Sequence, residues 1–295
     1  MDSETLRIFS AVAAELSITR AAARLGRAPS NVTTRIQQLE GELGIELFSR
    51  VGKRMSLSAA GERLVEYSAR LLALEEEARH VVSAGGHAGG LRIGSMESTA
   101  AARLPAVLAS YHRHYPQTRL QLQTGPSRPL LEKVRNGQLD CAFVALPADF
   151  GGLDGLSELG LQGCAVWREQ LLLALPADAL PAEGVGAIAL RSLAAFPQGC
   201  TYRGIAEQWL GVPGSLEWRV QEMNSYHAMI ACVAAGTCVS LLPESVLMLS
   251  PAHRQLQTLP VVQADTLLVW RQHYATPAFE RLQTLLPEAP DAPAV

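Results

Sequence analysis

The sequence predicts two fold classes in one chain, an all-α N-terminal part followed by an α/β part. Residues 2–85 show almost only helical periodicity, whereas from Leu91 onward short β-rich runs alternate with helical ones. The change falls at the glycine-rich stretch 85–90, which follows a helix and precedes a strand and is therefore interpreted as a hinge, not as a phosphate-binding loop. A length of 295 residues is enough for about two such domains.

The composition is that of a compact protein in which positive charge is concentrated in one place. Hydrophobic residues make up 48% and charged residues 18%, and 25 Lys and Arg face 28 Asp and Glu, a net charge of −3. Affinity for phosphate must therefore come from a local patch. The arginines at positions 20, 24, 27 and 35 form one, because no acidic residue lies between Leu16 and Leu39.

Three helices are predicted within the first 45 residues. Apolar residues at helical spacing from Leu6 to Ala13 indicate the first helix. Ser17 is the N-cap of a second helix that ends at Leu25, and Pro29 opens a third that runs to about Leu43. The order helix, helix, tight turn, helix follows from these signals.

The third helix and the segment after it carry groups suited to a DNA groove. Val32, Ile36 and Leu39 form the apolar face of this helix, and short hydroxyls and amides occupy most of the remainder. After Phe48 two extended pieces flank a turn with three cations, which is typical of the wing of an all-α winged helix-turn-helix. A helical bundle with a solvated arginine face is the alternative interpretation. The candidate DNA-binding residues are Arg20, Arg27, Ser30, Asn31, Thr33, Thr34, Arg35, Gln38, Arg50, Lys53 and Arg54.

A longer helix is predicted from its cap Ser58 to about Val82. The apolar residues of this helix alternate at spacings of three and four, which is a heptad pattern. Only about three heptads are present, so the pattern fits a pair of helices and a single helix packed on a domain core equally well. The candidate dimerisation residues are Leu64, Tyr67, Leu71, Leu74, Ala78 and Val81.

The C-terminal part begins with the order β-α-β-α-β, which predicts a parallel sheet. The strands are expected at 91–94, 119–123 and 141–145, and the helices at 100–111 and 130–135. The theme then repeats, with strands near 164–167, 171–175, 219–220 and 239–242 and helices near 205–210 and 225–235. This repetition implies two similar lobes.

The end of the chain, with a strand at 266–270 and a helix at 277–286, is expected to return to the first lobe. Lobe I would then span about 91–160 and 267–295, and lobe II about 161–266. Ligands in such folds bind between the lobes, at the carboxyl ends of the strands.

Polar residues at the turns from strand to helix are the candidate ligand contacts. They are Ser98, Thr99, Thr124, Ser127, Thr201, Tyr202, Arg203, Asn224 and Ser225. Arg203 could supply the cation that an acidic effector requires, whereas Glu97 argues against a simple anion site, so the chemistry of the ligand stays open. Each hydroxyl could instead only cap its helix.

Taken in order, the N-terminal segments resemble the LysR-type transcriptional regulators. The resemblance rests on A-A-x-x-L at 21–25, a hydroxyl-rich recognition helix, L-E-x-E-L-G-I-x-L-F-x-R at 39–50 and L-S-A-A-G-E at 57–62. Ala28 and Pro29 stand where the family often has a Ser-Gln pair, and Thr33 replaces a common serine. The C-terminal half resembles the LysR effector domain in N-G-Q-L-D-C-A at 136–142 and V-A-A-G at 233–236, so the resemblance covers nearly the whole chain.

This resemblance implies a winged helix-turn-helix DNA-binding domain at 1–58, a dimerising linker helix and hinge at 59–90, and a two-lobed, periplasmic-binding-protein-like effector domain at 91–295. It implies a cytoplasmic homodimer or homotetramer that binds double-stranded promoter DNA. A small-molecule effector, with a carboxylate among the candidates, would modulate that binding or activation. RNA polymerase is a further expected partner if the protein is an activator, and no membrane partner, cofactor or metal is expected.

Other functions are weighed on the same residues. A thiol-based redox-sensing regulator of the same family would use Cys200, one of five cysteines without a C-x-x-C pair. A solute-binding module without DNA function would lack residues 1–85 and carry an export signal, which the start Met1-Asp2-Ser3-Glu4 does not resemble. Catalysis is not expected, because G-x-S-x-G, H-E-x-x-H and histidines at metal spacing are all absent. The uncharged stretch 223–243 contains polar residues and a glycine and is predicted to be a buried helix, turn and strand.

Overall fold

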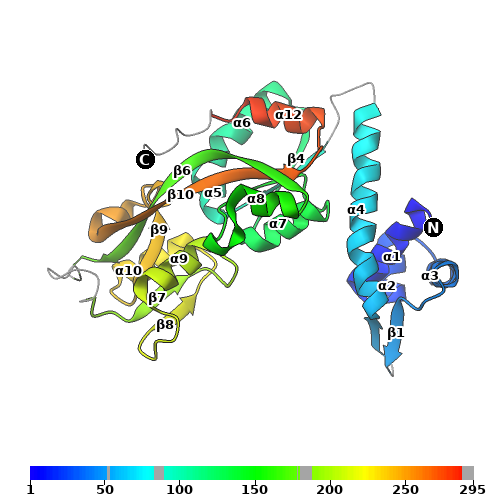
Figure 1. The fold of residues 1–295 in the computed structure, drawn as a ribbon, viewed down its shortest axis with the longest axis horizontal. Coiled ribbons are helices and arrows are strands. Elements are labelled where there is room, and N and C mark those ends of the chain that lie inside the picture. Colours follow the sequence, from blue (N-terminus) through cyan, green and yellow to red (C-terminus); the bar gives the residue numbers. More distant parts are fainter. Residues whose placement is uncertain (52–53, 83–89, 178, 180–187, 288–295) are drawn as a thin grey trace. The chain divides into compact units, whose positions relative to one another are not determined.

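The computed structural model describes residues 1–51, 54–82, 90–177, 179 and 188–287. The chain forms two compact units, one spanning Met1–Gly86 and the other almost all of His87–Val295 (Figure 1). The boundary falls in the glycine-rich stretch at which the sequence changes its periodicity.

The N-terminal unit has the predicted order of elements. It consists of α1 (Ser3–Glu15), α2 (Ile18–Leu25), α3 (Pro29–Leu43), the hairpin strands β1 (Phe48–Val51) and β2 (Arg54–Leu57), and α4 (Ala59–Val82). Local signals set these limits: the Ser17 hydroxyl accepts a hydrogen bond from the Arg20 amide, and Pro29 occupies the first turn of α3. Gly26 and Gly44 end their helices in the left-handed conformation.

A single hydrophobic core holds the N-terminal unit together. Phe9, Val12, Val32, Leu39 and Leu47 are among its buried members, and they come from α1, α3 and the segment before β1. The Glu40 carboxylate fixes that segment, because it accepts hydrogen bonds from the amides of Leu47 at 2.7 Å and Phe48 at 3.2 Å. The outer surface of α3 is therefore held on a rigid base.

The C-terminal unit is built on a six-stranded mixed sheet in the order β4-β3-β5-β10-β6-β9. The strands are β3 (Gly90–Ser95), β4 (Arg119–Thr124), β5 (Cys141–Val144), β6 (Leu161–Pro176), β9 (Ser240–Pro243) and β10 (Leu256–Arg271). A parallel pair, β7 (Ser192–Ala195) and β8 (Arg219–Glu222), forms a second sheet. The predicted parallel pairing holds for β3 with β4 and β5, whereas β10 pairs antiparallel with β5 and β6.

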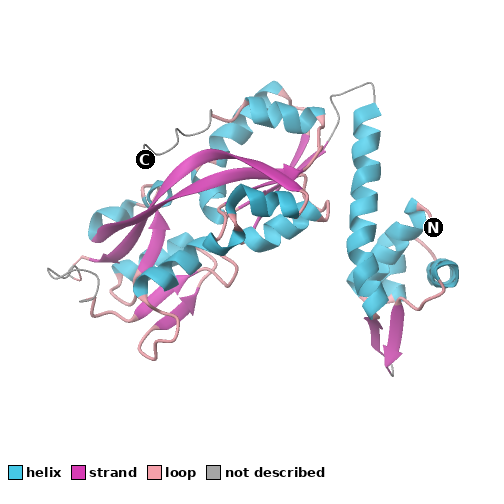
Figure 2. Ribbon diagram, viewed as in Figure 1, coloured by secondary structure: helices cyan, strands magenta, loops and turns pink. Residues whose placement is uncertain are grey.

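Two long antiparallel strands, β6 and β10, run through the whole unit (Figure 2). The sequence prediction of two short strands within 164–175 is wrong, because β6 is continuous over 16 residues. We call the part built on β3, β4 and β5 the first lobe and the part built on β7, β8 and β9 the second lobe. β6 and β10 belong to both and form the connection between them.

Helices cover both lobes. They are α5 (Glu97–Ala102), α6 (Leu104–His114), α7 (Ser127–Arg135), α8 (Gly152–Glu158), α9 (Thr201–Leu210), α10 (Tyr226–Ala234), α11 (Glu244–Leu247) and α12 (Pro277–Thr284), with short 3-10 turns at Ala148–Phe150 and Pro251–Gln255. The single helix predicted over 100–111 is wrong, because the chain breaks at Arg103 between α5 and α6. Pro105 has no amide proton to continue the hydrogen bonds of α5.

The end of the described chain packs on the first lobe. Phe279 and Leu282 of α12 lie in one core with Leu91 and Ile93 of β3. The uncharged stretch 223–243 forms α10, a turn and β9, as the sequence predicts. Among the described residues, none of the helices has the length and hydrophobicity that a membrane span needs.

Candidate functional site

The outer face of α3 presents a row of polar side chains. The structure brings five predicted residues together on this face, and we call them the polar ridge: Ser30, Asn31, Thr34, Arg35 and Gln38. Their neighbours on the opposite face are buried in the core. The result is a polar helical ridge on a rigid base.

Two hydroxyls of α3 already have partners within the helix. Thr33 donates to the Pro29 carbonyl and Thr34 to the Ser30 carbonyl, each at 3.0 Å. Such bonds are local and exchange readily with another acceptor. Thr33 is only partly exposed and does not belong to the polar ridge.

Acidic residues of α1 and its cap contact the predicted arginine patch. Glu15 pairs with Arg20 at 3.3 Å and with Arg24 at 3.6 Å. Glu4 pairs with Arg27, and Asp2 lies 4.0 Å from Arg35. The sequence prediction missed these pairs, because the acids precede the acid-free stretch. Exposed pairs of this kind are weak, so a phosphate can replace the carboxylate.

The wing residues are only partly described. Arg50 lies in β1 and Arg54 in β2, and the two strands pair antiparallel as predicted for a wing. Lys53 lies outside the described residues.

The helix α4 has an apolar stripe that no described residue of its own unit covers. Tyr67, Leu71 and Leu74 are 59%, 44% and 60% exposed. Leu64, by contrast, packs against the core of the N-terminal unit. Ala78 is exposed, and the side chain of Val81 is not among those described.

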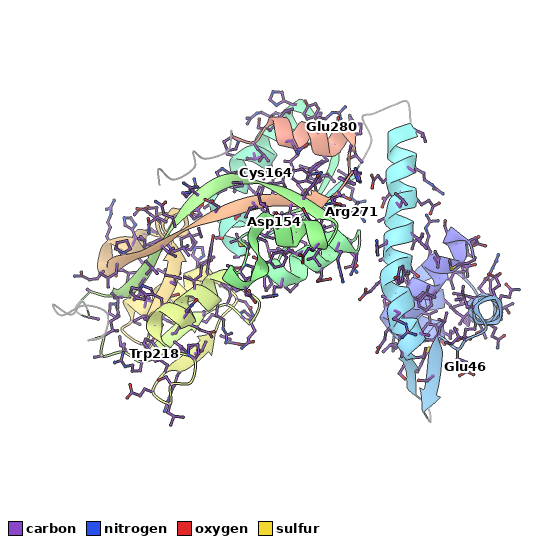
Figure 3. The ribbon with its side chains drawn as sticks, in the orientation of Figure 1. Glu46, Asp154, Cys164, Trp218, Arg271 and Glu280 are labelled. Carbon is purple, nitrogen blue, oxygen red and sulfur yellow. The ribbon has the colours of Figure 1, made fainter. Side chains whose placement is uncertain are left out.

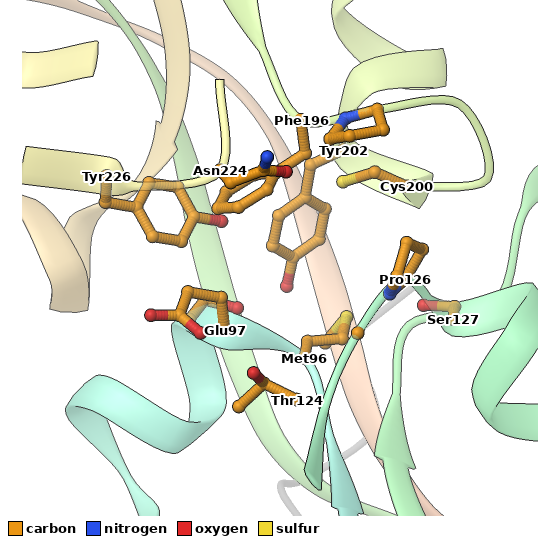
Figure 4. Close-up of a pocket in the computed structure, with 13 residues that line it drawn as sticks. Met96, Glu97, Thr124, Pro126, Ser127, Phe196, Cys200, Tyr202, Asn224 and Tyr226 are labelled. Carbon is orange, nitrogen blue, oxygen red and sulfur yellow. The ribbon is translucent and has the colours of Figure 1, made fainter. Parts of the chain in front are cut away.

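A cavity of about 280 Å³ lies between the two lobes of the C-terminal unit (Figure 4). It is lined by Met96, Glu97, Ser98, Thr124, Gly125, Pro126 and Ser127 from the first lobe and by Phe196, Pro197, Cys200, Tyr202, Asn224 and Tyr226 from the second. Of the predicted contacts, Ser98, Thr124, Ser127, Tyr202 and Asn224 line this cavity. The strand-to-helix turns singled out from the sequence therefore lie in the region of the cavity.

The other predicted contacts lie outside this cavity. Thr99 is buried in α5, and Ser225 is the N-cap residue of α10. The Thr201 hydroxyl donates to the Ala145 carbonyl at 2.6 Å. Arg203 is 9% exposed and pairs with Glu207 at 2.7 Å and Glu222 at 2.6 Å. The predicted cation for an acidic effector is therefore engaged elsewhere.

Three hydroxyls at the cavity wall make no hydrogen bond of good geometry within the described residues, although the Ser98 hydroxyl lies close to the phenol groups of Tyr202 and Tyr226. They belong to Ser98, Ser127 and Tyr202, which are 3%, 0% and 3% exposed. A buried polar atom without a partner costs about 1–3 kcal/mol, so these groups favour the entry of a polar molecule.

Aromatic rings form the wall on the side of the second lobe. The rings of Phe196 and Tyr226 meet edge to face with their centroids 4.8 Å apart. Burial raises the pKa of Tyr202 and of Tyr226 far above the ordinary value of a phenol, so both remain neutral hydrogen-bond donors. Sequence reasoning missed Phe196 and Tyr226 because apolar residues at such positions usually indicate core.

Cys200 also lines the cavity, and its surroundings do not suit a redox sensor. Burial raises the pKa of the Cys200 thiol, whereas a peroxide-reactive thiol needs a lowered pKa. All five cysteines are free. Cys141 and Cys238 are buried, while Cys164 lies exposed on β6 (Figure 3). The burial of Cys200 therefore does not favour the thiol-sensor alternative, which stays a prediction.

Comparison with protein families matches both parts of the chain. Residues 3–62 match the model of the "bacterial regulatory helix-turn-helix protein, lysR family", and residues 84–290 match the "LysR substrate binding domain". An uncharacterized HTH-type transcriptional regulator of Bacillus subtilis, YusT, is 36% identical over 265 residues, which is 90% of this chain and 86% of YusT. The regulator GltR of the same species is 36% identical over 248 residues, 84% of this chain and 81% of GltR.

Solved structures share the fold at lower identity. A full-length OxyR variant from Pseudomonas aeruginosa is 22% identical with a TM-score of 0.70, and covers 99% of both chains. Full-length CbnR complexed with its target DNA is 20% identical with a TM-score of 0.66, covering 97% of this chain and 99% of CbnR. LysG from Corynebacterium glutamicum with bound effector Arg is 20% identical with a TM-score of 0.60, covering 97% and 96%.

Proposed function

Because the chain belongs to the LysR family of bacterial transcriptional regulators, we propose that it reads promoter DNA with the outer face of α3 and the wing, under the control of a small molecule in the cavity between the lobes. Members of this family regulate transcription and are not enzymes. The observation that carries the assignment of the DNA-reading face is the polar ridge Ser30, Asn31, Thr34, Arg35 and Gln38 on a rigid helix.

The side chains of the ridge match the edges of bases in a major groove. Arg35 can bind a guanine through two hydrogen bonds, and Asn31 or Gln38 can do so with an adenine. The neighbouring arginines of α2 and the wing are suited to the phosphates on either side. CbnR, whose fold is similar, has been solved with its target DNA, which supports DNA as the ligand of the N-terminal unit.

We expect replacement of Arg35 by alanine to weaken the binding of operator DNA by about tenfold to a hundredfold, because a bidentate base contact is lost. The ion pair of Arg35 with Asp2 is long, at 4.0 Å, and exposed, so its loss should cost little stability. Gel-shift titration with genomic fragments selected on the wild-type protein measures the change. Arg113→Ala, an exposed arginine of α6, removes the same charge and should leave affinity unchanged.

Wild-type affinity itself should fall with salt, by about a thousandfold between about 50 and 200 mM if roughly six phosphates are contacted. A protein that retains no genomic fragment at low salt would overturn the proposal and favour the solute-binding module. An Arg35→Ala variant that binds like the wild type would reject α3 as the reading helix.

The exposed stripe of α4 is proposed to pair with a second copy of the chain. Tyr67, Leu71 and Leu74 recur at helical spacing and are exposed among the described residues of the N-terminal unit. Pairing of two such helices gives a dimer, and two dimers can give a tetramer. The two heads of a dimer would read half-sites about one helical turn of DNA apart or a multiple of it.

We expect Leu74→Glu to convert the protein largely to monomers at micromolar concentration, because a charge would enter the centre of an apolar seam. Light scattering after size-exclusion chromatography measures the mass in solution. Leu153→Glu on α8, where the native leucine is 53% exposed, is the matched control and should keep the wild-type mass. A Leu74→Glu dimer as stable as the wild type would assign another surface to self-association.

The response to a ligand follows from the position of the cavity between the lobes. A molecule that contacts both lobes stabilises one relative arrangement of them, and it must bind the active arrangement more tightly to shift the equilibrium. LysG, which shares the fold, has been solved with arginine bound as its effector. We also propose that the protein is cytoplasmic. If it activates transcription, we expect it to contact RNA polymerase.

A further inference from the structure

The cavity between the lobes carries one formal charge, and that charge is negative. Among its thirteen lining residues, Glu97 is the only Asp or Glu, and none is Lys, Arg or His. Within the described part of the chain the Glu97 carboxylate forms no salt bridge. This carboxylate is therefore available to a ligand.

The arginines that follow the cavity segments are engaged with other acids. Arg103, just after α5, donates to Glu169 at 2.7 Å. Arg203, next to Tyr202, is held by Glu207 and Glu222. A negatively charged ligand would consequently meet an unpaired carboxylate and no cation at the cavity wall.

The wall opposite Glu97 is aromatic. Tyr202, Tyr226 and Phe196 come from the second lobe. The phenol oxygen of Tyr202 points toward the side of the cavity where Glu97 lies, whereas that of Tyr226 points across the cavity toward Tyr202 (Figure 4). Aromatic rings attract cations through their electron-rich faces, and they also exclude water from the ligand. Met96 adds a polarisable, apolar contact.

We propose that the effector is a small organic cation, an amine or quaternary ammonium compound with an apolar body. Its nitrogen pairs with Glu97 and contacts the aromatic wall, while the unpartnered hydroxyls of Ser98 and Ser127 bind a polar group of the same molecule. A volume of about 280 Å³ lies at the lower end for ligand cavities and limits the molecule to a compact one. This inference rests on the proposed function of the cavity as the effector site, and it replaces the carboxylate considered from the sequence.

The test is calorimetric titration of the full chain with three probes of one shape: phenethylamine, phenethyl alcohol and phenylacetate at neutral pH. Choline and its uncharged carbon analogue dimethylbutanol form a second matched set. We expect each cation to bind at least about tenfold more tightly than its neutral or anionic counterpart, since the carboxylate lies in a partly desolvated site.

Glu97→Gln should lower the affinity for both cations about tenfold or more and change the affinity for the two alcohols less than about twofold. Glu97→Asp, which keeps the charge, should retain most of the preference. Glu158→Gln, an exposed residue at the end of α8, removes one negative charge elsewhere and should have no effect. Thermal unfolding of each variant shows that it is folded.

Phenylacetate binding as tightly as phenethylamine would overturn the cationic assignment and still leave the cavity as an effector site. A preference for cations that survives Glu97→Gln would overturn it as well. Kd values above about 10 mM for every probe would remove both the cation and the cavity from the proposal. DNA reading by α3 is tested separately through Arg35, so the two failures are distinguishable.

Discussion

Replacement of Gly61 by alanine is expected to destabilise the N-terminal unit strongly and to weaken DNA binding. A Cβ atom at this position would lie 2.1 Å from the carbonyl oxygen of Leu47 and 2.9 Å from the side chain of Leu57. The oxygen cannot move away, because it accepts a hydrogen bond from the Ser58 amide at 2.9 Å. The Leu47 amide is held by Glu40 at 2.7 Å. We estimate a cost of about 3 kcal/mol or more.

A loss of that size is a large part of the stability of a small domain and lowers its Tm by roughly 15 °C. Circular dichroism detects the early loss of helix, and gel shift detects the loss of binding. Gly41→Ala is the control, because nothing lies within 4 Å of a Cβ there and alanine favours the helix interior. A Gly61→Ala protein that melts and binds DNA like the wild type would contradict the packing described for α4 and the wing.

Local signals explain why the helices of the head could be predicted with their limits. Ser17 and Pro29 act within one turn of the helix that they begin, so their effect can be read from neighbouring residues. The need for glycine at position 61 is different, because it comes from Leu47, which is distant in the chain. The partner of Arg27 was missed for the same reason, because Glu4 reaches it only through the tertiary fold. Glu15 lies only five residues before Arg20, so that pair could have been predicted locally.

The cavity shows the same division between local and tertiary information. The turns that follow β3 and β4 could be predicted from the order of strands and helices, and both line the cavity. Of the two ion pairs of Arg203, only the one with Glu207 could be predicted from the sequence, because Glu207 lies one helical turn later. The other partner, Glu222, comes from β8. Phe196 and Tyr226 could not be separated from core residues by type alone. The sequence did not reveal that β6 is continuous, because the charged residues Arg168 and Glu169 interrupt its apolar pattern. In the structure both form ion pairs with residues outside β6.

Replacement of Arg103 by methionine is expected to destabilise the C-terminal unit by about 3 kcal/mol. The Glu169 side chain is 4% exposed, and Nε of Arg103 donates to its Oε1 at 2.7 Å. Without that partner a buried carboxylate stays uncompensated, which costs about 3–5 kcal/mol. We take the lower end because the Arg103 side chain is 35% exposed and water can reach the pair. Thermal unfolding followed by calorimetry measures the change.

The paired variant separates loss of the ion pair from loss of packing. Arg103→Met together with Glu169→Met should be more stable than Arg103→Met alone, because no buried charge is left. Asp265→Asn breaks the more exposed pair with Arg168 and should cost less than about 1 kcal/mol. Arg103 joins the end of α5, which carries Glu97 and Ser98, to the strand shared by both lobes. If the pair transmits ligand contact to β6, the double variant will keep its fold and lose part of its effector response in a reporter assay, whereas a purely structural pair would leave that response intact.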